Sequence, residues 1–182
     1  MFIKVCDNVI SEKYSKYLFE QVTNLKWTFV PNLSYGHSET NYKTAGFSYL
    51  FYLDKKYNNK ENSTIISKNF KIVIPLLLEA FEKFDLNLDL NNVFRSRARL
   101  TLNRDVSFVE DKHIDYKQSH LVLLYYFNTT DGDTVFYQND SIVESISPKR
   151  GRGVLFDGSI FHASSASTLS PRIVLNTNIN IN

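Results

Sequence analysis

Three side chains in the second half of the chain could together bind one metal ion. His113 and Asp115 are separated by a single residue, and on a strand the period of two places both side chains on the same face. His162 follows in the run FDGSIFHASS. Two imidazoles and one carboxylate on one face of an octahedron, with the other face open, are the ligands of non-haem Fe(II) in oxygen chemistry. The same three ligands can also hold zinc, so the pattern alone leaves the metal open.

Arg172 adds a candidate for binding an anionic ligand. It lies ten residues after His162 and opens the apolar run RIVLNTNI. An arginine on a strand that faces the core needs an anionic partner, and its planar guanidinium suits a carboxylate. We expect that partner to be the distal carboxylate of a keto acid that chelates the metal.

The stretch from about Arg97 to Asn178 resembles the 2-oxoglutarate- and Fe(II)-dependent dioxygenases, and within them the prolyl 4-hydroxylase-like branch. The resemblance is carried, in this order, by HID at 113–115, LLYYFN at 123–128, DGDTVFY at 131–137, SPKRGRGVLFDGSIFHAS at 147–164 and PRIVLN at 171–176. It implies a double-stranded β-helix, which is a cupin-like jelly roll. It also implies that His113, Asp115 and His162 are the catalytic iron ligands and that Arg172 binds the C5 carboxylate of 2-oxoglutarate.

Two further residues are carried over from the family pattern. The family usually places a tyrosine of a YYLN-like segment beside that arginine, and Tyr126 in YYFN matches the position. Prolyl-hydroxylating members often have a tyrosine about nine or ten residues before the first histidine ligand, where this chain has Asn103. Tyr126 and Asn103 are therefore expected to contact the cosubstrate, while the missing tyrosine weakens the inference to proline as substrate.

The resemblance implies a reaction as well as a site. Its cofactor is Fe(II), its cosubstrates are 2-oxoglutarate and O2, with ascorbate as an optional addition, and its products are succinate, CO2 and a hydroxylated C–H. Asp115 favours hydroxylation, because halogenating relatives lack this carboxylate. A peptide or protein residue is the expected substrate. The alternatives are a nucleobase or a small molecule under the same chemistry, or a cupin-like module that binds metal without redox activity.

Composition limits the size of the fold and its partners. The 182 residues, 43% of them hydrophobic, fit one domain. With 21 Lys and Arg against 19 Asp and Glu, the net charge of +2 disfavours broad electrostatic binding of nucleic acid. Cys6 is the only cysteine, which excludes an internal disulfide and suits a reducing compartment. No apolar run reaches the roughly 20 residues of a membrane helix.

These properties lead us to expect a soluble, cytoplasmic protein. The abundance of Asn, Lys, Ile and Tyr would suit an AT-rich genome, including a viral one whose product acts in the host cytoplasm. The oligomeric state does not follow from the sequence.

The elements that must position these residues form two blocks within one domain, 1–182. Residues 1–90 are expected to be a support of helices and loops. Helices are expected over Ser11–Trp27 and Ser67–Phe84, with Pro75 kinking or splitting the second. A strand at Gly46–Leu53 lies inside a Tyr-rich segment, Tyr35–Tyr57, that is a candidate substrate lid.

Residues 91–182 are expected to form the jelly-roll core, because short β-branched and aromatic runs alternate there with turn residues. The expected strands are Val93–Leu102, Val106–Val109, Leu121–Phe127, Thr134–Tyr137, Ser141–Ser147, Gly153–Phe156 and Arg172–Ile181. On the first of them the period of two puts Arg95, Arg97 and Arg99 on one face. That face is interpreted as solvated surface, with a place at the mouth of the active site as the alternative.

Overall fold

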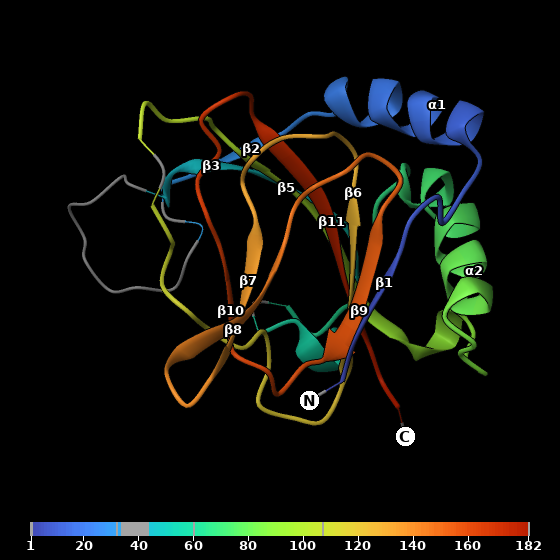
Figure 1. The fold of residues 1–182 in the computed structure, drawn as a ribbon. Coiled ribbons are helices and arrows are strands. Elements are labelled where there is room, and N and C mark those ends of the chain that lie inside the picture. Colours follow the sequence, from blue (N-terminus) through green and yellow to red (C-terminus); the bar gives the residue numbers. More distant parts are fainter. Residues whose placement is uncertain (1, 32, 34–43, 60, 107, 182) are drawn as a thin grey trace.

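The computed structural model describes residues 2–31, 33, 44–59, 61–106 and 108–181, and two antiparallel sheets form its framework (Figure 1). The larger sheet has the order β1 (Ile3–Cys6), β9 (Gly153–Asp157), β6 (Leu121–Tyr126), β11 (Arg172–Ile179), β5 (Val93–Thr101), β3 (Gly46–Leu53) and β2 (Thr28–Val30), with β4 (Ile65–Ile66) also paired to β3. The smaller sheet has the order β10 (His162–Ser164), β7 (Thr134–Gln138) and β8 (Ser141–Ile146). This is the expected mainly β, jelly-roll fold.

The two faces of the larger sheet bury two separate apolar clusters, as strand β6 illustrates. Val122, Leu124 and Tyr126 pack with side chains of the smaller sheet, such as Phe136, in the space between the sheets. The intervening Leu123 and Tyr125, by contrast, join the cluster on the outer face. Side chains of even number on β6 therefore point into the barrel, as the period of two requires.

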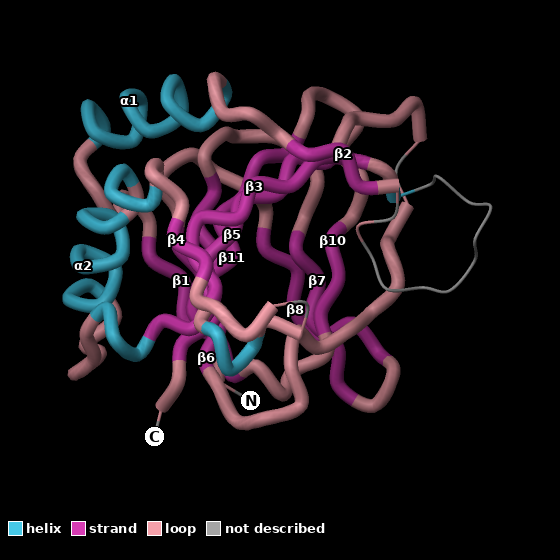
Figure 2. Tube along the Cα trace, turned by 180° about the vertical axis from the view of Figure 1, so that it is seen from behind, coloured by secondary structure: helices cyan, strands magenta, loops and turns pink. Residues whose placement is uncertain are grey.

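Two helices, α1 (Glu12–Thr23) and α2 (Ile74–Lys83), cover the outer face of the larger sheet. Leu18 and Val22 of α1 and Leu77 and Phe81 of α2 are buried in the outer cluster. Figure 2 shows both helices on the side of the molecule away from β7, β8 and β10. The helices therefore support the sheet and leave the space between the sheets free for a site.

Both predicted helices are present, with corrected ends. Ser11 caps α1 by accepting a hydrogen bond from the Tyr14 amide at 3.3 Å, but the helix ends at Thr23. The second predicted helix is split into two parts. A 3-10 turn, η3 (Phe70–Ile72), precedes α2, and Pro75 lies in the first turn of α2. Proline is tolerated there because its missing N–H has no intrahelical partner to lose. Two further short 3-10 helices are η2 (Lys55–Tyr57) and η4 (Leu90–Asn92).

Several strand predictions need correction. The expected strand Val106–Val109 is wrong, since Val109 makes only an isolated bridge to Ser165. Strands β1 and β2 were not expected, and together with β3 and β4 they extend the larger sheet with residues from the first half of the chain. Within the candidate lid, Gly46–Leu53 forms strand β3, while residues 34–43 lie outside the described residues. No helix in the described ranges is long and apolar enough to cross a membrane.

Candidate functional site

His113 and His162 face each other across an isolated antiparallel bridge. The His113 amide donates to the His162 carbonyl at 2.9 Å, and the His162 amide donates to the His113 carbonyl at 3.0 Å. Their ring centres lie 4.8 Å apart. The bridge thus joins the HID segment to β10 and brings together two histidines that are far apart in the sequence.

Each imidazole is held by its Nδ1 atom. Nδ1 of His113 lies 3.2 Å from the Asp111 carbonyl, and Nδ1 of His162 lies 3.1 Å from the Ile160 carbonyl. Because a carbonyl can only accept, these contacts place the proton of each neutral ring on Nδ1 and leave the lone pair on Nε2 for a metal ion. Burial, with the neighbouring His162, lowers the pKa of His113 to about 4, and burial also lowers the pKa of His162. Both rings are therefore neutral near pH 7.

Asp115 is buried, and its two oxygens have different surroundings. Oδ2 accepts hydrogen bonds from the Asn176 and Asn178 amides at 3.0 and 2.9 Å. Oδ1 lies 3.0 Å from Arg95 Nη2 as an ion pair, but it accepts no well-aligned hydrogen bond. Burial raises the pKa of Asp115, yet the charge of Arg95 and the other surrounding groups outweighs burial and holds that pKa well below its usual range. The carboxylate is therefore ionised.

The donor atoms of His113, Asp115 and His162 lie within 4.8 Å of one another. Among the described residues this is the one cluster of three or more His, Cys, Asp or Glu side chains with such proximity. Two Nε2 lone pairs and a buried carboxylate oxygen without a well-aligned donor fit one divalent ion. The set also matches the two-histidine, one-carboxylate triad of non-haem iron.

Arg172 lies at the start of β11 and is 4% exposed. Its Nη2 donates to Thr134 Oγ1 at 2.7 Å, and its guanidinium carbon lies 5.3 Å from the centre of the Tyr126 ring. The Tyr126 hydroxyl is also 2.7 Å from Thr134 Oγ1, and burial raises the pKa of Tyr126. Nε of Arg172 is buried and has no hydrogen-bond partner within the described part of the chain. This donor is consistent with an anionic ligand.

One pocket connects the metal cluster with Arg172. Its walls include His113, His162, Arg172, Thr134 and Arg99. Two of the three metal-cluster residues and Arg172 therefore share one pocket.

Asn103 is exposed in the segment after β5 and does not line the pocket, so the structure lends no support to a contact with the cosubstrate. His120, the histidine directly before β6, does not line the pocket either. It is 1% exposed, with Nδ1 2.7 Å from the Gln118 carbonyl.

Arg95, Arg97 and Arg99 correct the interpretation of their face as solvated surface. Arg95 is 6% exposed and Arg99 9% exposed, and Arg97 is half-buried. Their strand, β5, lies beside β11, where Arg95 pairs in register with Asn178 and Arg97 with Asn176. The arginines thus line the inside of the barrel.

Three residues that were not predicted hold the site together: Asn176 and Asn178 bind Asp115, and Thr134 binds Arg172. A usable signal was present for the two asparagines, because the period of two from Arg172 places residues 174, 176 and 178 on the face of Arg172. Thr134 carried no such signal, since it belongs to the other sheet.

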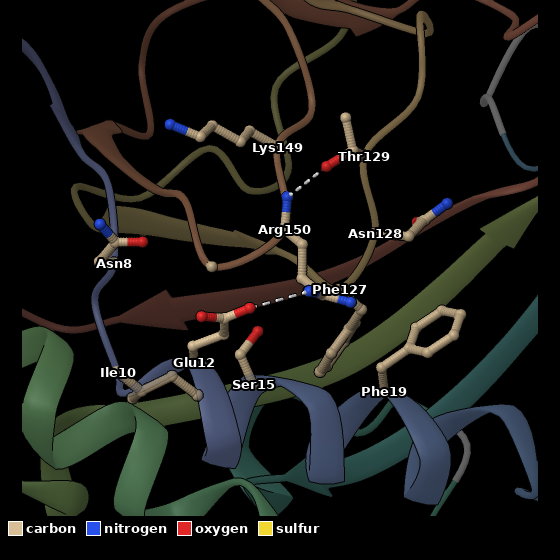
Figure 3. Close-up of a pocket in the computed structure, with 11 residues that line it drawn as sticks. Asn8, Ile10, Glu12, Ser15, Phe19, Phe127, Asn128, Thr129, Lys149 and Arg150 are labelled. Carbon is tan, nitrogen blue, oxygen red and sulfur yellow. Dashed lines mark hydrogen bonds and ion pairs between the residues drawn. The ribbon is translucent and has the colours of Figure 1, made fainter.

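A larger cleft, of about 420 Å3, lies elsewhere, between α1 and the segments 127–129 and 149–151 (Figure 3). Its cations are already paired: Arg150 lies 3.7 Å from Glu12, and Lys149 lies 2.8 Å from Asp7. None of the three metal-cluster residues lines it. We therefore place the functional site inside the barrel rather than in this cleft.

Comparisons of the fold point to one group of enzymes. A 2OG-Fe(II) oxygenase family oxidoreductase from Burkholderia pseudomallei superposes with a TM-score of 0.71 at 10% identity, covering 98% of this chain and 84% of the other. A Trichoplax adhaerens prolyl hydroxylase, solved with a hypoxia inducible factor peptide fragment, gives 0.65 at 14% identity, covering 98% and 83%. A Pseudomonas putida prolyl-4-hydroxylase gives 0.59 at 11% identity, covering 98% and 92%.

Sequence comparison adds nothing to this likeness, as no protein-family model and no curated protein sequence matches the chain. At these identities the agreement concerns the fold. The chain has the double-stranded β-helix fold of the 2-oxoglutarate/Fe(II) oxygenases, prolyl hydroxylases included.

Proposed function

We propose that this protein is a 2-oxoglutarate- and Fe(II)-dependent dioxygenase that hydroxylates a C–H bond of a peptide or protein residue. One observation carries the proposal: the donor atoms of His113, Asp115 and His162 lie within 4.8 Å of one another, and Arg172 lines the same pocket as the two histidines. A metal-binding module without redox chemistry needs the three ligands. It has no need of a buried arginine beside them.

Fe(II) with 2-oxoglutarate supplies the oxidation when bound: O2, 2-oxoglutarate and a substrate C–H give succinate, CO2 and the corresponding C–OH. His113 and His162 would hold the ion through Nε2, and Asp115 would hold it through its carboxylate. A triad of this type leaves coordination positions for cosubstrates.

Arg172 is proposed to bind the C5 carboxylate of 2-oxoglutarate. Thr134 already accepts from one nitrogen of its guanidinium and fixes its orientation, while Nε remains without a partner in the described residues. Tyr126 lies beside the guanidinium and shares the Thr134 hydroxyl, so its role is to position Arg172. A charged hydrogen bond in such a buried place is stronger than one in water.

The apolar lining of the barrel supports the same function. Val122, Leu124, Phe136 and Phe156 are buried beside the site, and the ring of Phe156 lies 4.9 Å from that of His162. These side chains make the interior of the barrel apolar next to the site, and exclusion of side reactions is part of the protein's contribution in cofactor enzymes.

Three observations favour a peptide substrate, the last two of them by disfavouring nucleic acid. The Trichoplax adhaerens structure holds a prolyl hydroxylase with a bound peptide fragment. The net charge of +2 lacks the basic excess of proteins that grip nucleic acid. Arg95 and Arg99, which on an exposed face could have bound a nucleic-acid strand, are buried inside the barrel.

Succinate formation tests the proposal. Purified protein with Fe(II), 2-oxoglutarate and O2 should produce succinate, and a panel of proline-containing peptides should raise the rate. Succinate formation should be lost in His113→Ala, Asp115→Ala and His162→Ala. It should persist in Arg150→Met, which alters a distant exposed arginine. Absence of any succinate in every arm, including alkylated oligonucleotides and small acids, would reject the proposed activity.

A further inference from the structure

Arg99 is the one pocket-lining arginine to which the proposed function gives no role. It lies on β5 and is 9% exposed. Its Nη2 donates to the Leu33 backbone carbonyl, which carries no formal charge. No carboxylate in the described ranges lies within ion-pair distance of it. A buried cation without such a partner is costly, so the site favours an anion.

The register of β5 and β11 places Arg99 between the two ends of the site. Arg172 pairs with Thr101, and the next inward-facing pair is Val174 with Arg99. Beyond it come Asn176 and Asn178, the two residues that bind Asp115. Diagonal neighbours on one face of an antiparallel pair are about 7–8 Å apart, within reach of long side chains. Arg99 thus lies on the path from Arg172 to the metal cluster.

The Arg99 side chain can serve a further ligand in this position. Burial lowers the pKa of Arg99, while the charges of Glu110 and Asp115 act to raise it. The guanidinium has further N–H donors beyond the one used by Leu33.

We propose that Arg99 binds the metal-chelating C1 carboxylate of 2-oxoglutarate, so that each carboxylate of the dianion is matched by one buried arginine. This inference rests on the proposed function. Asn103, which was expected to contact the cosubstrate, has an exposed side chain and does not line this pocket.

The test measures binding, with no turnover, on the full chain loaded with Mn(II). The probes are 2-oxoglutarate and two acids that chelate metal but lack the C5 carboxylate, 2-oxobutanoate and oxalate. Affinities are measured by calorimetry, and bound Mn(II) by electron paramagnetic resonance. The variants are Arg99→Met, Arg99→Lys and Arg172→Met, with Arg150→Met as the control far from the pocket.

Arg99→Met should weaken 2-oxoglutarate and the short acids by the same factor, about tenfold to a hundredfold, the loss expected for one hydrogen bond to a charged group. Arg99→Lys should retain part of the affinity that Arg99→Met loses. Arg172→Met should weaken 2-oxoglutarate alone. Affinity for Mn(II) without acid should not fall in Arg99→Met, which separates direct binding from damage to the metal cluster.

Two results would overturn the role of Arg99 while leaving the proposed function intact: unchanged affinities in Arg99→Met, or a loss for 2-oxoglutarate that the short acids do not share. Wild-type protein that holds Mn(II) but binds none of the acids would instead reject the proposed function. Thermal unfolding of each variant without ligand identifies a variant that fails to fold, and Arg99→Lys then supplies the comparison.

Discussion

Arg95 Nη2 lies 3.0 Å from Asp115 Oδ1, and both side chains are almost completely buried. The guanidinium occupies one side of the oxygen that is proposed to bind the metal ion. Its carbon also lies 4.8 Å from the centre of the Tyr116 ring, which helps to fix its position. Arg95 therefore stabilises the carboxylate when no metal is present and competes with a bound cation for its charge.

Replacing Arg95 by Met should separate these two effects. Without metal, the loss of one partner of a buried ion pair should lower the free energy of unfolding by about 3–5 kcal/mol. Saturating Mn(II) should raise the melting temperature more in the variant than in the wild type, because the ion has no competing guanidinium. Thermal unfolding with and without Mn(II) measures both, with Arg95→Lys as the charge-retaining control. Equal shifts in variant and wild type would contradict this account of the pair.

Asn103→Ala should leave the affinity for 2-oxoglutarate within twofold of the wild-type value. The side chain is exposed and does not line the pocket. Calorimetry on the Mn(II)-loaded protein measures this affinity. A tenfold or greater loss of affinity in the variant would show that Asn103 contacts the cosubstrate.

Gly158→Ala should destabilise the fold through His120. A Cβ at position 158 would lie 2.2 Å from two atoms of the buried His120 ring, a distance that no side chain tolerates. Overpacking of this kind costs about 1–3 kcal/mol or more. Denaturant unfolding measures the loss. Adding His120→Ala should make the double variant more stable than the sum of the two single changes predicts, and strict additivity would show that the two positions do not clash.

Asp7 should make stability depend on pH in the acid range. Hydrogen bonds from Arg152 and then Lys149 lower its pKa from 3.8 to about 2. A carboxyl whose pKa is lower in the folded than in the unfolded chain stabilises the fold at pH values above its unfolded pKa. That contribution disappears as the pH falls from about 3.8 to 2. The stability difference between wild type and Asp7→Asn should therefore be present at pH 6 and vanish near pH 2. The contribution is modest because the pair is partly exposed. A difference that persists at pH 2 would exclude the ion pairs as its source.

Much of the site could be predicted because the chemistry constrains residue types more tightly than it constrains the surrounding chain. The short separation of His113 from Asp115 and the position of Arg172 after His162 indicated these residues. The structure brings the three donor groups within 4.8 Å of one another and places Arg172 in the pocket that the two histidines line. Strand texture, in turn, indicated the jelly roll, because short β-branched and aromatic runs, such as those of β6 and β11, are separated by turn residues.

The rest depended on which elements lie side by side. The period of two puts Arg95 and Arg99 on one face, but only pairing with β11 and the smaller sheet shows that this face is inside. Strand β1 escaped prediction because the short run Ile3–Cys6 is largely exposed at the edge of the sheet and carries no buried pattern. The segment Val106–Val109 has strand-like residues but no partner strand beyond the bridge of Val109.

Iron content after anaerobic loading tests the central claim most directly. Wild-type protein incubated with Fe(II) and 2-oxoglutarate, then passed through a desalting column under nitrogen, should retain one iron per chain. His162→Ala and Asp115→Ala, prepared identically and confirmed as folded, should retain almost none. Iron that stays bound in both folded variants, or a wild type that keeps zinc and refuses iron, would contradict the assignment of His113, Asp115 and His162 as the iron site.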